Sequence, residues 1–201
     1  VTLEVGVHYI DPTPADQDRR ADVGQHLNLP IRGLSSPGYI TPPGIGPTLV
    51  VRSGQTLKVR LINTLSSEPS EGKLAFPPVP PGSDGMLNGK ALNIPCCTNN
   101  TNIHVHGMHV SPEAPGDDIK TLVRPCEHFD YVFQIPDNQA PGFHWGHPHH
   151  PQSTGIQTAM GMVFAILVED ENDDSEPALL KELRETGCMR VGSITNYMFE
   201  Q

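Results

Sequence analysis

The sequence predicts an all-β domain with many turns. The 201 residues include 19 glycines and 21 prolines, a share that favours short strands joined by turns over a helical bundle. Several short runs alternate apolar and polar residues, as half-buried strands do. The apolar run at 161–168 ends at acidic residues and is typical of a buried central strand. The length allows one domain with an appendage or two small domains.

The first half of the chain contains three predicted strands. Residues 1–9 alternate apolar and polar side chains, so we expect an opening strand there. Residues 11–47 contain many prolines and little periodicity, which predicts irregular connecting chain. Residues 48–52 and 56–63 are rich in β-forming residues and are separated by a Ser53-Gly54 turn. We expect a pair of strands there.

The second half continues this pattern after an interruption. Residues 66–90 are rich in proline and glycine and are predicted to form a long surface loop. Four further strand-like runs follow and bring the expected number to six or seven strands: 102–110, 129–135, 142–145 and 161–168.

The domain is predicted to end near residue 170. The acidic run 169–174 is typical of a solvated linker. A short helix is expected at 178–185, because Pro177 suits its first position and Gly187 its end. The β-like run 189–199 then has no partner, so we expect residues 171–201 to contain this linker, the helix and the first strand of a following domain, after a first domain at 1–170. The start at Val1 suggests a mature chain after signal removal or a piece of a longer protein.

Charge and hydropathy exclude several function classes. The formal net charge of −10 would repel nucleic acids and anionic membrane surfaces. The longest apolar stretch, 160–168, is about half of the ~20 residues that a membrane span needs. We therefore expect neither a nucleic-acid partner nor a membrane span.

The cysteines leave two readings open. Cys96, Cys97, Cys126 and Cys188 form no Cys-x-x-Cys pair, which argues against a zinc ribbon or a thioredoxin-like motif. One or two disulfides in an oxidising compartment and free buried thiols are both compatible with this pattern. Asn99 opens an Asn-Asn-Thr glycosylation acceptor pattern.

Histidines are concentrated in one part of the chain. Eight of the ten lie between positions 104 and 150, including the pairs His104-Val-His106 and His147-Pro-His149. Residues i and i+2 of a strand share one face about 6 to 7 Å apart, so each pair presents two imidazoles to one place. Imidazole ligands without a carboxylate triad favour copper or zinc. The sequence therefore predicts a metal site.

Four segments resemble a known family in order and spacing. They look like the N-terminal cupredoxin domain of multicopper oxidases of the bacterial laccase or bilirubin-oxidase type: 45–63, 101–112, 142–150 and 160–170. The resemblance implies a Greek-key β-sandwich of cupredoxin-like fold and a copper cofactor. It also implies an oxidoreductase that reduces dioxygen to water with electrons from a phenolic or metal-ion donor, in a secreted or periplasmic location.

The resemblance also implies roles for individual residues. His104 corresponds to a ligand of the type 2 copper, and His106, His147 and His149 correspond to ligands of the type 3 pair. Asp117 matches the acid that helps to deliver protons to reduced oxygen, and Asp118 is the next candidate. These histidines are half of the family's cluster ligands, so the other half must come from a further domain or chain, without which we expect the isolated chain to be inactive.

The type 1 copper of the family is expected outside this chain. The nearest candidate run, Cys126-Glu-His128, is followed by no methionine or second histidine at suitable spacing. Gly146 stands where the family often has an aromatic residue, and Pro151-Gln152 where it often has His-Gly.

The other histidines are given ordinary roles. We expect His109, His144 and His150 to orient ligands or pack near them, as Trp145 and Met108 would. His8, His26 and His128 are expected at the surface.

Two alternatives remain at this point. A lone cupredoxin-like module could bind copper without turnover, using the same histidines. A mononuclear enzyme of cupin or carbonic-anhydrase type would use one pair and one distant histidine. A cupin would also need a glutamate shortly after the first pair, and Glu113 is rather distant.

Overall fold

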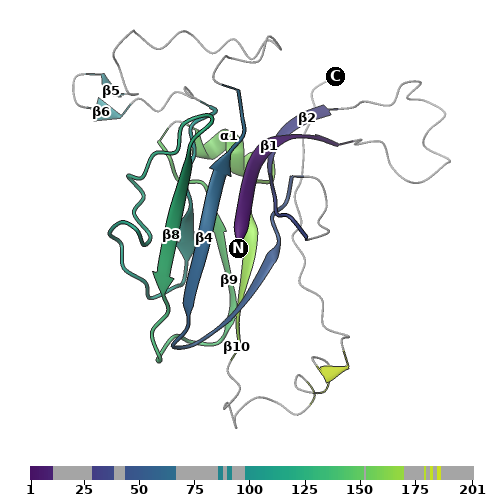
Figure 1. Cartoon of the computed structure of the whole chain (residues 1–201), viewed down its shortest axis with the longest axis vertical. Helices are drawn as coiled ribbons and strands as arrows, with labels where there is room; N and C mark the ends of the chain where they lie inside the picture. The colour runs from purple at the N-terminus through teal and green to yellow at the C-terminus, as the bar shows by residue number, and fades with distance from the viewer. Residues whose placement is uncertain are drawn as a thin grey trace, which may run out of the picture.

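The computed structural model shows a two-layer β-sandwich (Figure 1). It describes residues 1–10, 29–38, 44–66, 86–87, 90–91, 98–151 and 153–169, with the isolated positions 179, 182, 185 and 186. Each layer is a four-stranded sheet, and a separate two-stranded sheet joins β5 (Met86–Leu87) to β6 (Lys90–Ala91). The predicted all-β class and the cupredoxin-like sandwich are confirmed.

The first sheet has the strand order β2-β1-β4-β8. Its strands are β1 (Thr2–Ile10), β2 (Leu29–Ser35), β4 (Thr56–Asn63) and β8 (His128–Gln134). The β1/β4 pair is parallel, whereas β1/β2 and β4/β8 are antiparallel.

The second sheet has the order β3-β10-β9-β7 and carries four histidines, His104, His106, His144 and His147. Its strands are β3 (Thr48–Arg52), β7 (His104–His106), β9 (Gly142–His147) and β10 (Phe164–Glu169). The β3/β10 pair is parallel and the other two are antiparallel. A short helix, α1 (Thr154–Ala159), connects β9 to β10.

The core lies between the two sheets and includes large aromatic rings. Tyr131, Phe133 and Phe164 are all at most 2% exposed, and burial of such a side chain contributes about 1.5–3 kcal/mol. The Tyr131 hydroxyl also accepts a hydrogen bond of 3.0 Å from the backbone N–H of Ile103, directly before β7. Burial raises the pKa of this hydroxyl well above its usual value, so it stays protonated. The core thereby holds the chain at the point where β7, the strand of His104 and His106, begins.

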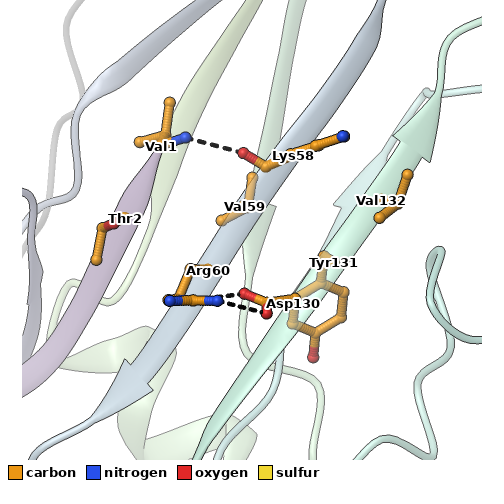
Figure 2. Close-up of a pocket in the computed structure, with 8 residues that line it drawn as sticks. All are labelled: Val1, Thr2, Lys58, Val59, Arg60, Asp130, Tyr131 and Val132. Carbon is orange, nitrogen blue, oxygen red and sulfur yellow. Dashed lines mark hydrogen bonds and ion pairs between the residues drawn. The ribbon is translucent and has the colours of Figure 1, made fainter.

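The outer face of the first sheet is polar. Arg60 on β4 and Asp130 on β8 form two hydrogen bonds of 2.7 and 2.8 Å across the strand pair (Figure 2). They line a shallow hollow of about 470 Å³ together with residues of β1, β4 and β8. Both side chains are about half exposed, so the pair contributes little to stability.

The strand predictions were largely right, with four differences. Residues 86–87, at the end of the predicted 66–90 loop, form β5 and pair with β6. The irregular chain predicted at 11–47 contains β2, an edge strand that pairs with β1 through its backbone and so needs no apolar alternation. The strand predicted at 102–110 covers only His104–His106, because Gly107 turns the chain at φ +75°. Helix α1 was not predicted, since its six residues carry no apolar repeat.

Some predictions fall outside the described residues. These include most of the 66–90 loop, the acidic linker from residue 170, the 189–199 strand and nearly all of the 178–185 helix. The domain boundary therefore stays a prediction. Cys126 is a free, exposed thiol, whereas Cys96, Cys97 and Cys188 are not described. Among the described residues, no helix has the length and apolar character to cross a membrane.

Gly146 on β9 leaves room for an aromatic ring of the core. A Cβ atom at this position would lie 2.2 Å from Cζ of Phe164, on the neighbouring strand β10. The ring therefore occupies the space into which a side chain at position 146 would begin. The glycine, found where the family often has an aromatic residue, is a packing requirement in this chain.

Gly146→Ala should destabilise the fold by about 1–3 kcal/mol, because the new methyl group must displace the Phe164 ring. Urea unfolding would measure the loss. Gly155→Ala is the matched control, since a Cβ there meets nothing within 4 Å and alanine favours the helix. Equal unfolding free energies for the two variants would contradict this account of the packing.

Candidate metal centre

The pairing of β7 with β9 brings the histidine motifs together. His104 lies opposite His147, and His106 lies opposite Trp145. The residues between them, Val105 and Gly146, face the core and are buried. Since side chains alternate along a strand, the four rings lie on the outer face of the second sheet.

His106, Trp145 and His147 form a close aromatic group. The His106 ring stacks on Trp145 with centroids 4.4 Å apart and planes 7° apart, and Trp145 and His147 lie 4.8 Å apart. The Nε2 atoms of His106 and His147 are only 2.8 Å apart. The two imidazoles therefore direct their Nε2 atoms toward the same place.

The Nδ1 atoms of two histidines are held by hydrogen bonds. Nδ1 of His104 lies 2.8 Å from Oδ2 of Asp117, whose Oδ1 accepts a 3.0 Å hydrogen bond from the Val105 N–H. Nδ1 of His147 lies 2.7 Å from the carbonyl oxygen of Pro148. Because an acceptor at Nδ1 places the proton there, Nε2 of each ring keeps its lone pair. This is the tautomer that a metal ligand needs.

His149 joins the group from beyond the end of β9. Its ring centroid lies 5.0 Å from that of His104 and 5.8 Å from that of His147. Its backbone N–H donates a 2.6 Å hydrogen bond to Oδ1 of Asn102. All four predicted ligands therefore lie in one cluster.

Burial keeps several of these imidazoles neutral. Desolvation lowers the pKa of His147 to about 4 and lowers the pKa values of His106 and His150 as well. The neighbouring histidines add to this effect at His106 and His147, since each would repel a second positive charge. Neutral imidazole is the form that binds metals.

Asp117 lies beside the histidines in a half-buried position. Desolvation raises the pKa of its carboxyl group, against the hydrogen bonds from Val105 and His104 that favour the ionised form. Asp118, the next candidate, accepts a hydrogen bond from the Lys120 N–H. Of the two acids, Asp117 is the one in contact with a predicted ligand.

The donor atoms of the cluster are imidazole nitrogens. Among the residues that the structure describes, no three histidine, cysteine or acidic side chains converge to hold one metal ion. The Nε2 atoms of His104, His106 and His147 nevertheless lie on one exposed face of the sheet. Imidazole nitrogen suits copper, so these residues fit the metal that the resemblance implies.

The remaining predicted residues lie around this cluster. Nε2 of His144 is 3.2 Å from the carbonyl oxygen of Ala140, and its ring covers Gly107, where a Cβ would lie 2.6 Å from Nδ1. His109 is held through its backbone N–H by Oε1 of Gln139 at 2.7 Å. Met108 packs against the core.

Other predicted residues lie elsewhere or are not described. Cys126 and His128 line a separate hollow of about 140 Å³ beside β8. Residue His26 is not described, and neither is the side chain of His8.

Two buried amides at the site were not predicted. Asn102 and Gln139 hold the backbone of His149 and of His109, and the Gln139 amide also donates to the carbonyl oxygen of Gly107 at 3.0 Å. Each contacts main-chain atoms far away in the sequence. No local pattern marks such a contact.

The metal-free protein should lose stability when the pH falls from about 6.5 to 4. His147 has a native pKa of about 4 against about 6.5 for an unfolded histidine, so the unfolded chain binds more protons in this window. Urea unfolding in chelator at pH 7 and pH 5 would measure the change.

His147→Asn should reduce this pH dependence, whereas His128→Asn, at an exposed position, should leave it unchanged. Asp117 acts in the opposite direction: because its pKa is raised, its contribution is lost as the pH rises above about 3.8 through the native value. Identical pH profiles for wild type and His147→Asn would show that the His147 environment is not as described.

Comparison with known proteins finds similarity to multicopper oxidases. Residues 91–173 match the family model described as multicopper oxidase. A multicopper oxidase of Staphylococcus haemolyticus is 23% identical over 134 residues, which cover 67% of this chain and 22% of that protein. One of Staphylococcus epidermidis is 22% identical over the same shares. The chain thus spans about a fifth of the length of these relatives.

Solved structures show the same fold. The multicopper oxidase of Campylobacter jejuni, described as a metallo-oxidase, superposes with a TM-score of 0.51 at 19% identity, over 86% of this chain and 26% of that one. A bacterial laccase-like multicopper oxidase of Ochrobactrum sp. gives a TM-score of 0.51 at 16% identity, over 87% and 28%. The chain is therefore similar to multicopper oxidases, in sequence over residues 91–173 and in the fold of these structures.

Proposed function

We propose that this chain supplies half of the histidine ligands of a type 2/type 3 trinuclear copper cluster, which a further domain completes. The observation that carries the proposal is the gathering of His104, His106, His147 and His149 on one sheet, with centroid separations of 4.7 to 5.8 Å. The whole protein would then be an oxidase that uses dioxygen as electron acceptor.

The geometry supports a division of the four ligands. Two nitrogens bound to one tetrahedral ion at about 2.0 Å are roughly 3.3 Å apart. The 2.8 Å separation of Nε2 in His106 and His147 is close to this value, so these two histidines would share one type 3 copper. His149 would bind the second type 3 copper and His104 the type 2 copper.

Copper, when bound, would supply the electron transfer to dioxygen, a reaction that consumes protons as well as electrons. The chain's own part is to hold the imidazoles and to handle protons. Asp117 fixes His104 through Nδ1, and burial raises the pKa of its carboxyl group. An acid with a raised pKa near the reacting oxygen is suited to proton delivery. Asp117 is therefore the proposed proton donor.

The outer face of the second sheet supports docking of a further domain. One cross-strand row of this face is apolar, formed by Val50, Leu167 and Phe143. Val50 is 56% and Phe143 57% exposed, and the row continues the face that carries the histidines. The outer face of the first sheet instead carries Arg60 and Asp130. An exposed apolar face of this kind marks an interaction site.

The two alternatives are weaker. A mononuclear enzyme of cupin type needs at least three ligands from its own chain, and the described residues do not converge in this way. A copper-binding module without turnover would use the same histidines but no second domain, which leaves the apolar row unexplained.

The electron donor would be phenolic or a metal ion. We propose a secreted or periplasmic location because of the copper chemistry.

His147→Ala, in the complete polypeptide, should lower the copper content, because it removes one of two nitrogens that share a copper. Metal analysis after dialysis would measure the loss, and oxygen consumption should fall with it. His109→Ala is the control: it lies on the same part of the chain, but it is held through its backbone. Full copper retention by His147→Ala would refute the ligand assignment.

Phe143→Asp should weaken the docking of the completing domain, because it places a charge in the apolar row without changing a ligand. Copper content and limited proteolysis of the complete polypeptide would detect the loosened interface. Ile62→Asp, on the outer face of the first sheet, serves as the matched control. If both variants behaved alike, the second sheet would not be the docking face.

A further inference from the structure

Asn102 is a buried polar residue two positions before His104. Its side chain is 1% exposed and makes three hydrogen bonds. Nδ2 donates to the carbonyl oxygens of Ile119 at 2.8 Å and of Thr121 at 3.1 Å, and Oδ1 accepts from the His149 N–H at 2.6 Å. One amide therefore connects three segments that are separate in the sequence.

His149 needs such a contact more than the other three ligands do. His104, His106 and His147 lie in the paired strands β7 and β9, whose ladder fixes their backbone. β9 ends at His147, and His149 follows Pro148 in the connection to α1. Within the described part of the chain, the His149 N–H donates its hydrogen bond to the Asn102 side chain.

The same amide also ties the Asp117 segment to the site. Asp117 is anchored to β7 by Val105 and His104, and the chain returns four residues later to the Asn102 amide at Thr121. An amide is suited to this position because it offers two donors and an acceptor at once. A side chain with only donors or only acceptors could not make this set of bonds.

We propose that Asn102 is a positioning residue for His149, which sets the imidazole of His149 opposite His104 for copper binding. This inference rests on the proposed function. Asn102 would not touch copper itself. It acts through the backbone of a ligand, so its loss should weaken copper binding without removing a donor atom.

Asn63 offers a matched control. It is likewise a buried asparagine, 0% exposed, whose Nδ2 donates to the carbonyl oxygens of Asn99 and Val123 at 2.7 and 3.0 Å. Its Oδ1 accepts from the Leu65 N–H at 3.2 Å. The two amides make the same kinds of bonds, but within the described part of the chain the Asn63 side chain forms no hydrogen bond with a histidine.

Copper affinity of the complete polypeptide, measured by chelator competition, tests the proposal. Asn102→Ala should weaken the copper site about tenfold, as loss of a group that orients a ligand does. Asn63→Ala should change the affinity by less than about twofold, although both variants lose thermal stability. Equal effects of the two variants on copper affinity would reduce Asn102 to a structural residue and overturn the proposal.

A double-mutant cycle with His149→Ala shows whether Asn102 acts through this ligand. In the His149→Ala background, Asn102→Ala should add less than about twofold to the loss of affinity. An additional tenfold loss would mean that Asn102 acts by another route. If His149→Ala itself left copper binding unchanged, His149 would not be a copper ligand and the proposed function would fail. This outcome differs from one in which only Asn102→Ala lacks its expected effect, which would overturn the role of Asn102 alone.

A further measurement needs no variant and covers the case in which Asn102→Ala does not fold. Hydrogen exchange of the His149 amide in the wild-type protein should be slowed at least tenfold relative to an exposed amide, because a buried acceptor holds it. Exchange at the rate of an unprotected amide would overturn the proposal.

Discussion

The antiparallel pairing of β7 with β9 is the constraint on which the site depends. β7 has only three residues, yet its register against β9 places His104 opposite His147 and His106 opposite Trp145. A shift by one residue would turn the histidines toward the core and Val105 outward. Burial of Val105 and Gly146 opposes that shift, and so the core decides which way the imidazoles point.

The polar contacts around this pair of strands then determine the chemical state of the rings. Asp117 and the Pro148 carbonyl oxygen hold Nδ1 of His104 and of His147, which leaves Nε2 as the available donor atom. Burial works in the same direction by disfavouring the charged imidazolium at His147. Orientation, tautomer and protonation state thus arise from separate groups that favour the same form.

Much of the fold and the gathering of the four histidines could be predicted from local pattern. Strands such as β4 alternate buried and exposed side chains. The two histidines of a His-x-His pair on a strand lie on the same face of the sheet. Strand β2 was missed because an edge strand is held by backbone hydrogen bonds that any sequence can form. Gly146 looked like a departure from the family pattern, and only the position of Phe164 explains it.

The supporting groups at the site were beyond sequence reasoning for a related reason. The Asn102 amide contacts carbonyl oxygens 17 and 19 residues away and an N–H 47 residues away. Such bonds depend on tertiary structure, because their partners are main-chain atoms that carry no residue identity. Sequence patterns identify the histidines, whereas only the fold shows which groups hold them.

The end of β9 between His147 and His149 separates the proposed ligands by local stability. His147 belongs to a ladder that continues through β10 to β3, so releasing it requires opening of the sheet. His149 lies outside the ladder and is secured by one side chain. Local opening can therefore free one proposed ligand while its neighbour two residues away stays fixed. Two histidines of one short motif thus belong to regions that unfold at different free-energy cost.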